Sequence, residues 1–221
     1  MPHSTFFLAP GLGSFWLSVT LFALATSASP GPVNVVAASS GARFGLRPSL
    51  PYVAGASLGF ALLLLGLGLG PGVALVHRPG FQMVLRVLGS LYLIHLAWRL
   101  QRSALPDEAP AADGPEAAAA DRHAHCPPRW TAGLLAQWLN PKAWVVAAAG
   151  VSGYTLPGER HGLSVVLMAG VFFAVCLPSI GAWAASGEGM RHLLRSPAML
   201  RRFNRLMAAA LLLSVLTLWW G

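Results

Sequence analysis

Residues 25–36 read "ATSASPGPVNVV" and place Pro30, Gly31 and Pro32 directly after an apolar run that begins to cross a membrane. Proline has no backbone N–H, and inside a helix it costs about 3 kcal/mol or more. In lipid, no water replaces the lost hydrogen bond. The break therefore predicts that this part of the backbone lines a polar space instead of contacting lipid.

The composition of the whole chain is that of a membrane protein. Its 221 residues are 55% hydrophobic and only 10% charged, whereas a soluble domain is about 25% charged. The net charge of +8 comes from basic residues scattered between apolar blocks. This pattern is typical of topology signals and not of a nucleic-acid surface. We therefore expect the lipid bilayer, and no nucleic acid, among the partners.

The apolar blocks predict an all-α membrane protein with six transmembrane helices. Each block is near the roughly 20 residues that a helix needs to cross about 30 Å of hydrocarbon. The first span is interrupted at the Pro-Gly-Pro sequence, and the fourth is interrupted at Asn140-Pro141. The predicted spans cover residues 15–40, 51–70, 81–101, 130–152, 163–186 and 206–220.

The segment 103–129 separates the third span from the fourth. It is rich in alanine and proline and holds five of the seven acidic residues, a composition that cannot bury enough apolar surface to become ordered. We expect a flexible cytoplasmic linker between two three-helix repeats, 1–102 and 130–221. Because each repeat has an odd number of spans, the two repeats must be inverted relative to each other.

Basic residues are distributed unequally between the two sides of these spans. Cytoplasmic loops carry an excess of Lys and Arg, so the arginine-rich side faces the cytoplasm and both termini face outward, toward the periplasm or the exterior. The sparse side has Arg78, Arg86 and Arg160. The rich side has Arg43, Arg47, Arg99, Arg102, Arg122, Arg129, Arg191, Arg195, Arg201, Arg202 and Arg205.

The two breaks occupy matching positions, in the first span of each half. Paired interruptions in inverted halves point to a transporter site near the middle of the membrane, although each could instead be a structural kink. Asn140 is a good N-cap and Pro141 a good first helical residue, while Ser29 or Gly31 can cap a half-helix that begins at a proline. The free N–H groups at such a start attract anions.

Lys142 adds an ionisable group to the second break. It is either neutral, or snorkels to water, or takes its counter-charge from the substrate. We favour the substrate, because no Asp or Glu lies inside a predicted span. A carboxylate would pair with this lysine, whereas nothing would balance a cationic side chain. The candidate substrate-binding residues are Pro30, Gly31, Pro32, Asn34, Asn140, Pro141 and Lys142, with Asn34 or Asn140 helping backbone carbonyls to hold the ammonium group.

With these motifs the chain resembles the LysE/RhtB family of amino-acid exporters. The family shares Pro-Gly-Pro in the first span and Asn-Pro-Lys in the fourth. Three further segments are similar to the family's motifs: "GLRPSLPYVAGASLG" through Gly45, Arg47, Gly55 and Gly59, "LGSLYLIHLAWRL" through Gly89 and Tyr92, and "GLLAQWLNPKAW" through Gly133. The departures are Pro48 and Ala97, which replace usual glycines, and His95, at an often apolar position.

The resemblance implies export of an amino acid or a similar metabolite across the bacterial inner membrane, driven by a gradient of H⁺ or Na⁺. The absence of acids from the spans narrows the expected cargo to a neutral amino acid or related carboxylate. The alternative is divalent metal-ion export, because relatives of the family move metal cations. We expect no cofactor.

Histidines and cysteines supply weaker candidates. His95 is either a proton carrier, since histidine changes charge near neutral pH, or, more commonly for a lone histidine on an apolar face, a packed residue. The tract "HAHC" holds the soft ligands His123, His125 and Cys126, but a closed metal site needs four placed ligands. A polar linker with incidental histidines is the simpler interpretation.

Two further questions concern packing and function class. The Gly55-x-x-x-Gly59 face packs either within the protomer or between the protomers of a homodimer. An intramembrane enzyme would need a nucleophile–base pair or a metal cluster within the spans, and the sequence has neither. A purely structural subunit needs no matched breaks and no internal lysine. The sequence therefore predicts a secondary transporter and not an enzyme.

Overall fold

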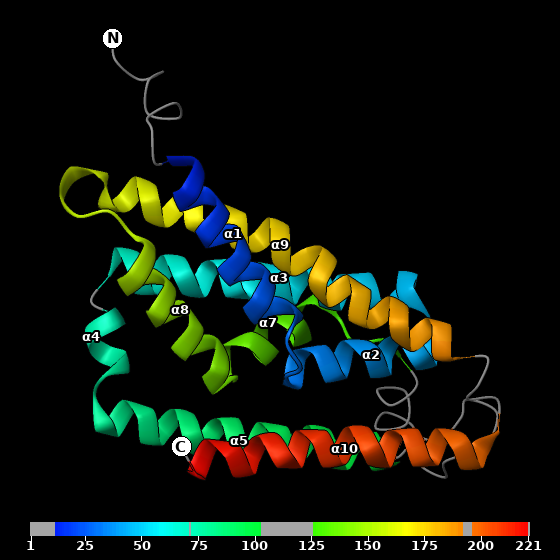
Figure 1. Ribbon diagram of the computed structural model, residues 1–221. Helices are drawn as coiled ribbons and strands as arrows, with labels where there is room; N and C mark the ends of the chain where they lie inside the picture. Colours follow the sequence, from blue (N-terminus) through cyan, green and yellow to red (C-terminus); the bar gives the residue numbers. More distant parts are fainter. Residues whose placement is uncertain (1–11, 71, 103–125, 192–195, 221) are drawn as a thin grey trace.

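The computed structural model describes residues 12–70, 72–102, 126–191 and 196–220, and this part of the chain is helical with no strand (Figure 1). The longest of the described helices has 30 residues. The elements are α1 (Leu12–Ala28), α2 (Pro32–Phe44), α3 (Leu46–Leu69), α4 (Gly72–Val76), α5 (Pro79–Arg102), α7 (Trp130–Trp138), α8 (Pro141–Tyr154), the 3-10 turn η3 (Gly158–Arg160), α9 (His161–Met190) and α10 (Pro197–Trp220).

Within the described residues, four helices are long and apolar enough to cross a membrane: α3, α5, α9 and α10. The pair α1 and α2 is bent by 60° and makes a fifth span if the two are counted together. The prediction of an all-α protein with several apolar spans is therefore confirmed at the level of four or five candidate spans.

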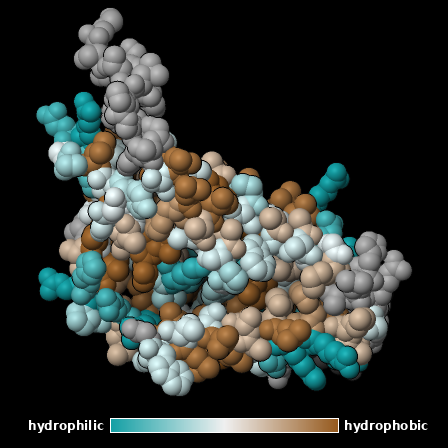
Figure 2. Space-filling model, viewed as in Figure 1, coloured by the Kyte–Doolittle hydropathy of each residue, from teal (hydrophilic) through white to brown (hydrophobic). Residues whose placement is uncertain are grey.

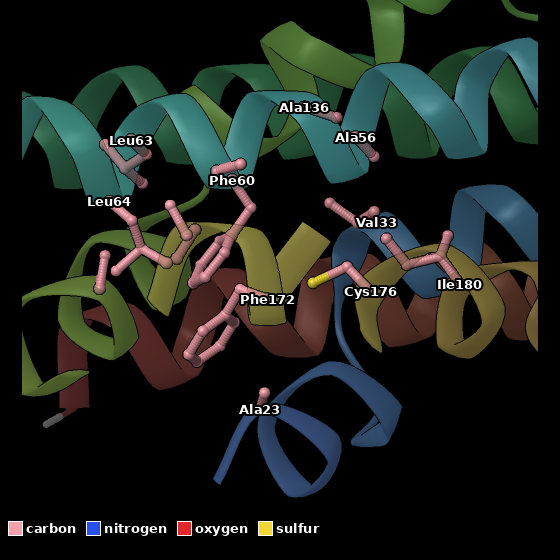
Figure 3. Close-up of a cluster of buried hydrophobic side chains, with 14 of the residues drawn as sticks. Ala23, Val33, Ala56, Phe60, Leu63, Leu64, Ala136, Phe172, Cys176 and Ile180 are labelled. Carbon is pink, nitrogen blue, oxygen red and sulfur yellow. The ribbon is translucent and has the colours of Figure 1, made fainter. Parts of the chain in front are cut away.

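Helices α3 and α9 pack against each other and organise the core. The first broken pair, α1 and α2, packs on α9, and the second, α7 and α8, packs on α3. Aromatic rings fill the contact between α3 and α9, where the ring centroids of Phe60 and Phe172 lie 5.0 Å apart (Figure 3). Each broken pair is thus supported by an unbroken helix of the other half of the chain.

Helices α5 and α10 lie side by side and form a separate layer (Figure 1). Val35 of α2 joins this layer to the core by packing against Leu93 of α5 and Leu211 of α10. Their outer faces remain apolar, and Leu91 and Leu213 are each 60% exposed. Strongly hydrophilic residues lie mainly toward the ends of the face in Figure 2, as expected when an apolar band contacts lipid.

Two helices begin earlier than the predicted spans 51–70 and 206–220. Helix α3 begins at Leu46, because Gly45 has φ 91° and turns the chain directly from α2 into α3. Pro48 is tolerated because the first turn of a helix needs no backbone donor. Helix α10 begins at Pro197. Its first turns carry arginines, so hydropathy marked only the apolar part of a longer helix.

The face made by Gly55 and Gly59 packs within the protomer. A Cβ atom on Gly55 would overlap the carbonyl oxygen of Trp130 in α7, and one on Gly59 would lie 3.0 Å from the Cα atom of Leu134. Gly133 of α7 lies equally close to the backbone of α3 at Tyr52. The two backbones touch, which brings the second broken pair against the middle of α3.

Candidate functional site

The first break leaves carbonyl groups at the end of α1 that side chains satisfy. Asn34 Nδ2 donates hydrogen bonds to the carbonyl oxygens of Ser27 and Ser29, at 2.8 Å and 2.9 Å. Trp183 Nε1 of α9 donates to the carbonyl oxygen of Ala28 at 3.1 Å. Because unpaired backbone groups are costly in a membrane, these bonds explain how the helix can stop here.

The start of α2 lacks such a cap. Gly31 is its N-cap in extended backbone, Pro32 is the first helical residue, and no side chain accepts from the first turn. Within the described part of the chain, the N–H groups of Val33 and Asn34 have no hydrogen-bond acceptor. The positive end of the α2 dipole is therefore available to an anion.

The second break is capped by its own asparagine, as the sequence predicts. Asn140 Oδ1 accepts a hydrogen bond from the backbone N–H of Lys142 at 3.2 Å, and Pro141 is the first residue of α8. Trp144 Nε1 donates to the carbonyl oxygen of Trp138 at 2.7 Å, which satisfies the end of α7. The two breaks thus differ, because α8 has a capped start and α2 an open one.

Lys142 is the only lysine in the chain, and it joins the two breaks. Its Nζ atom donates to Ser29 Oγ at 2.6 Å and to the carbonyl oxygen of Pro30 at 3.3 Å. A Cβ atom on Gly31 would lie only 3.6 Å from the same Nζ atom. The half-buried ammonium group therefore lies beside the open start of α2, and the two described oxygens that accept from it are neutral.

A small cavity surrounds this ammonium group. Its volume is about 50 Å³, enough for a few water molecules. A hydrophilic area is visible in the middle of the molecular face that Figure 2 shows. Six helices contribute to its wall, and none of the described residues that form it is Asp or Glu. The lining residues are Thr26, Ser27, Ser29, Gly31, Val33, Asn34, Phe60, Gln137, Asn140, Lys142, Ala143, Val146, Cys176 and Ile180.

The predicted site residues are brought together around this cavity. Four of them line it, namely Gly31, Asn34, Asn140 and Lys142. Pro30 contributes its carbonyl oxygen to Lys142. Pro32 and Pro141 are buried and begin the two half-helices, without lining the cavity.

The other candidates lie elsewhere. His95 is exposed on α5 with its ring centroid 6.2 Å from that of Trp98, and it is not among the lining residues. Its role as proton carrier stays a prediction. His123 and His125 lie outside the described residues. Cys126 is an exposed free thiol.

Sequence reasoning missed several polar residues of the cavity wall. Ser27 Oγ lies 3.0 Å from Cys176 Sγ, which brings α1 against α9. Gln137 of α7 also lines the cavity, although it is only 6% exposed. A signal for Gln137 was available, since it is a polar residue in an apolar run, three positions before Asn140. Nothing in the sequence indicated that Cys176, 149 positions away from Ser27, belongs to the same wall.

The sequence of this chain is similar to a known protein family and to several named proteins. The sequence profile of the LysE type translocator family matches residues 24–218. A cysteine/O-acetylserine efflux protein of Escherichia coli O139:H28 (strain E24377A / ETEC) is 30% identical over 208 residues, which cover 91% of this chain and 93% of that protein. Proteins of the same name from Escherichia coli (strain K12) and Shigella flexneri are 30% identical over 191 residues, 83% of this chain and 86% of theirs. No solved structure gives a significant match.

The family match covers most of the chain, including both breaks and Lys142. Members of this family are transporters and not enzymes. Together with the apolar helices, this makes the protein a multi-pass inner-membrane protein that handles a small molecule. The chain belongs to the LysE type translocator family.

Proposed function

We propose that the protein exports a small neutral amino acid, or a closely related carboxylate metabolite, across the bacterial inner membrane. Export is driven by a gradient of H⁺ or Na⁺. The substrate occupies the cavity between the two breaks, with its carboxylate beside Lys142 and the start of α2, and its ammonium group beside Asn34 Oδ1.

One observation carries this proposal: the single lysine bridges the two breaks beside a cavity whose described lining residues include no carboxylate. A half-buried ammonium group is unfavourable unless an opposite charge or several acceptors stabilise it. The uncapped N–H groups of Val33 and Asn34 also favour a negatively charged ligand group, because donors at a helix start attract an anion. An amino-acid carboxylate supplies that charge each time it enters.

Asn34 suits the ammonium end of the same substrate. Its Nδ2 atom already donates to two carbonyl oxygens, so the amide is oriented with Oδ1 as its remaining acceptor. The carbonyl oxygens of the α1 end lie beside it. A zwitterion can therefore be held at both ends by α1 and α2 together with Lys142.

The inverted repeat and the topology are parts of the proposal. We propose six spans, with α1–α2 and α7–α8 as the two broken ones, arranged as inverted repeats 1–102 and 130–221. The helix packing supports the inverted arrangement, because each broken pair packs on the unbroken helix of the other half of the chain. The arginine distribution supports termini that face outward. Rocking of one repeat against the other would then expose the cavity to either side.

The cargo class follows from charge and from the relatives. The cavity wall has no described acid to balance a cationic side chain. The relatives are named for cysteine and O-acetylserine, two neutral and small amino acids. These observations favour amino-acid export over metal-ion export. Nothing in the described part of the chain favours a metal ion as the cargo.

Counterflow in proteoliposomes tests the proposal. The purified protein is reconstituted and screened with cysteine, O-acetylserine, serine, lysine and a divalent metal. We expect counterflow of the neutral amino acids and not of lysine or the metal. Lys142→Met should weaken the apparent affinity for the neutral substrate by about tenfold or more, because hydrogen bonds to a charged group are worth about 1.5–3 kcal/mol.

Arg78→Met is the matched control, since it removes an exposed cation outside the cavity wall. Its counterflow should equal that of the wild-type protein. Strong lysine counterflow without neutral-amino-acid counterflow would overturn the proposed cargo. Unchanged affinity in Lys142→Met would overturn the proposed site.

A further inference from the structure

We propose that Gln137 forms a hydrogen bond with the side chain of the cargo and thereby selects small neutral amino acids that carry a hydrogen-bonding group near the β-carbon. The inference rests on the proposed function and extends it to a residue that determines specificity. It concerns the part of the cavity that neither Lys142 nor the α2 start occupies.

The carboxamide of Gln137 faces the cavity: it is not among the buried unpaired groups of the described residues, and its residue forms part of the cavity wall. The residue is only 6% exposed and lines the cavity, and the described residues offer its side chain no hydrogen bond. Such a group inside a cavity wall is explained if the ligand that enters completes its hydrogen bonds.

The neighbouring amides of the cavity are already committed. Asn34 Nδ2 donates to two backbone carbonyl oxygens, and Asn140 Oδ1 accepts from the N–H of Lys142. Each is thereby fixed in one orientation as part of its break. Gln137 keeps both its donor and its acceptor, so it can pair with a hydroxyl, a thiol or an ester oxygen.

Packing holds Gln137 at a fixed place in the wall. Trp138 Nε1 donates to the carbonyl oxygen of Gly59 at 3.0 Å, which fastens the last turn of α7 to α3. A Cβ atom on Gly59 would lie 3.4 Å from the Cβ atom of Gln137. The stem of the glutamine is thus pressed against α3, and only its amide end is free to meet a ligand.

This arrangement favours polar over apolar side chains of equal size. A site built to hydrogen-bond a substrate hydroxyl rejects the analogue that lacks it, because the polar group of the site is then left unpaired. Serine and alanine differ only by that hydroxyl. We therefore expect the wild-type protein to prefer serine to alanine through Gln137.

The test measures counterflow of labelled serine and of labelled alanine by the reconstituted protein. Gln137→Met keeps the length of the side chain and removes its hydrogen-bonding groups. We expect the serine-to-alanine ratio of apparent affinities to fall about two- to twelvefold, the range of one hydrogen bond worth about 0.5–1.5 kcal/mol. Alanine counterflow should change by less than about twofold.

Gln82→Met is the matched control, because Gln82 Nε2 donates to the carbonyl oxygen of Val76 and does not line the cavity. Its ratio should equal that of the wild-type protein. If Gln137→Met does not fold, the milder Gln137→Asn variant serves, with thermal stabilisation by serine and by alanine as the readout. That variant should lose stabilisation by serine and keep stabilisation by alanine.

Three outcomes overturn the inference. An unchanged ratio shows that Gln137 does not touch the cargo side chain, and an equal loss for both substrates gives it a structural role or a role toward the ammonium group. In both cases the proposed function survives, since wild-type counterflow is still present. If the wild-type protein carries neither serine nor alanine, nor any other neutral amino acid, the proposed function fails and the inference fails with it.

Discussion

At the scale of single residues, Ser29 links the first break to the lysine of the second. Its hydroxyl group donates to the carbonyl oxygen of Thr26 at 2.8 Å and accepts from Lys142 Nζ at 2.6 Å. One oxygen thus ends α1 and also positions the ammonium group. The serine acts through the lysine, so its loss should affect substrate binding more than folding.

Ser29→Ala should weaken the apparent affinity for the amino acid by about three- to tenfold, because the ammonium group loses its shorter hydrogen bond and keeps only the one to Pro30. Counterflow with a substrate titration measures the change. Ser214→Ala is the control, since Ser214 Oγ donates to the carbonyl oxygen of Ala210 in α10, outside the cavity wall. Equal affinities in the two variants would contradict the positioning role.

The residues that could be predicted are those whose chemistry conflicts with their surroundings. Proline and lysine stand out in an apolar run because lipid tolerates neither a missing donor nor a charge. Ser27 and Cys176 fit easily into apolar helices, so nothing marked them before α1 and α9 came together. The cap of α8 by Asn140 was predictable from its residue type, but the absence of a side-chain cap at the start of α2 depended on the geometry of the folded break, in which Ser29 accepts from Lys142 instead.

At the scale of helices, α2 and α9 pack with their backbones in contact. A Cβ atom on Gly41 would overlap the carbonyl oxygen of Ala184, and one on Gly187 would overlap that of Ala38. Close approach between small residues is a main source of helix association in membranes. The crossing holds α2 against α9 in the other half of the chain, on the far side of the break from α1.

Gly187→Val should destabilise the protein by about 1–3 kcal/mol, the usual cost of overpacking, because the carbonyl group of Ala38 belongs to a helix backbone and cannot move aside. Thermal unfolding of the detergent-solubilised protein measures this as a lower melting temperature. Gly181→Val is the matched control in the same helix, since a Cβ atom at Gly181 has no heavy atom within 4 Å. Similar melting temperatures for the two variants would show that the close crossing does not stabilise the fold.

At the scale of the whole molecule, the spans place the connections at two ends. The turn from α2 to α3 at Gly45 belongs to the arginine-rich end, and the turn at η3 between α8 and α9 belongs to the sparse end. Hydropathy was sufficient to predict several apolar helical spans, and the count of three spans per half stays a prediction. Hydropathy did not predict that α5 and α10 form a layer of their own (Figure 1), because the apolar faces of both helices suit lipid and protein equally well.

The orientation of these ends can be tested with cysteines, because the chain has only two and Cys176 is buried. Cys126 is exposed at the edge of the predicted cytoplasmic linker. A membrane-impermeant maleimide should therefore label it only after the cells are permeabilised. Glu159→Cys in a Cys126→Ser background provides an exposed thiol at the opposite end, in η3, and it should be labelled in intact cells. The positive-inside rule predicts this pair of results. If Cys126 is labelled in intact cells and the new thiol only after permeabilisation, the predicted orientation in the membrane, with both termini outward, is wrong.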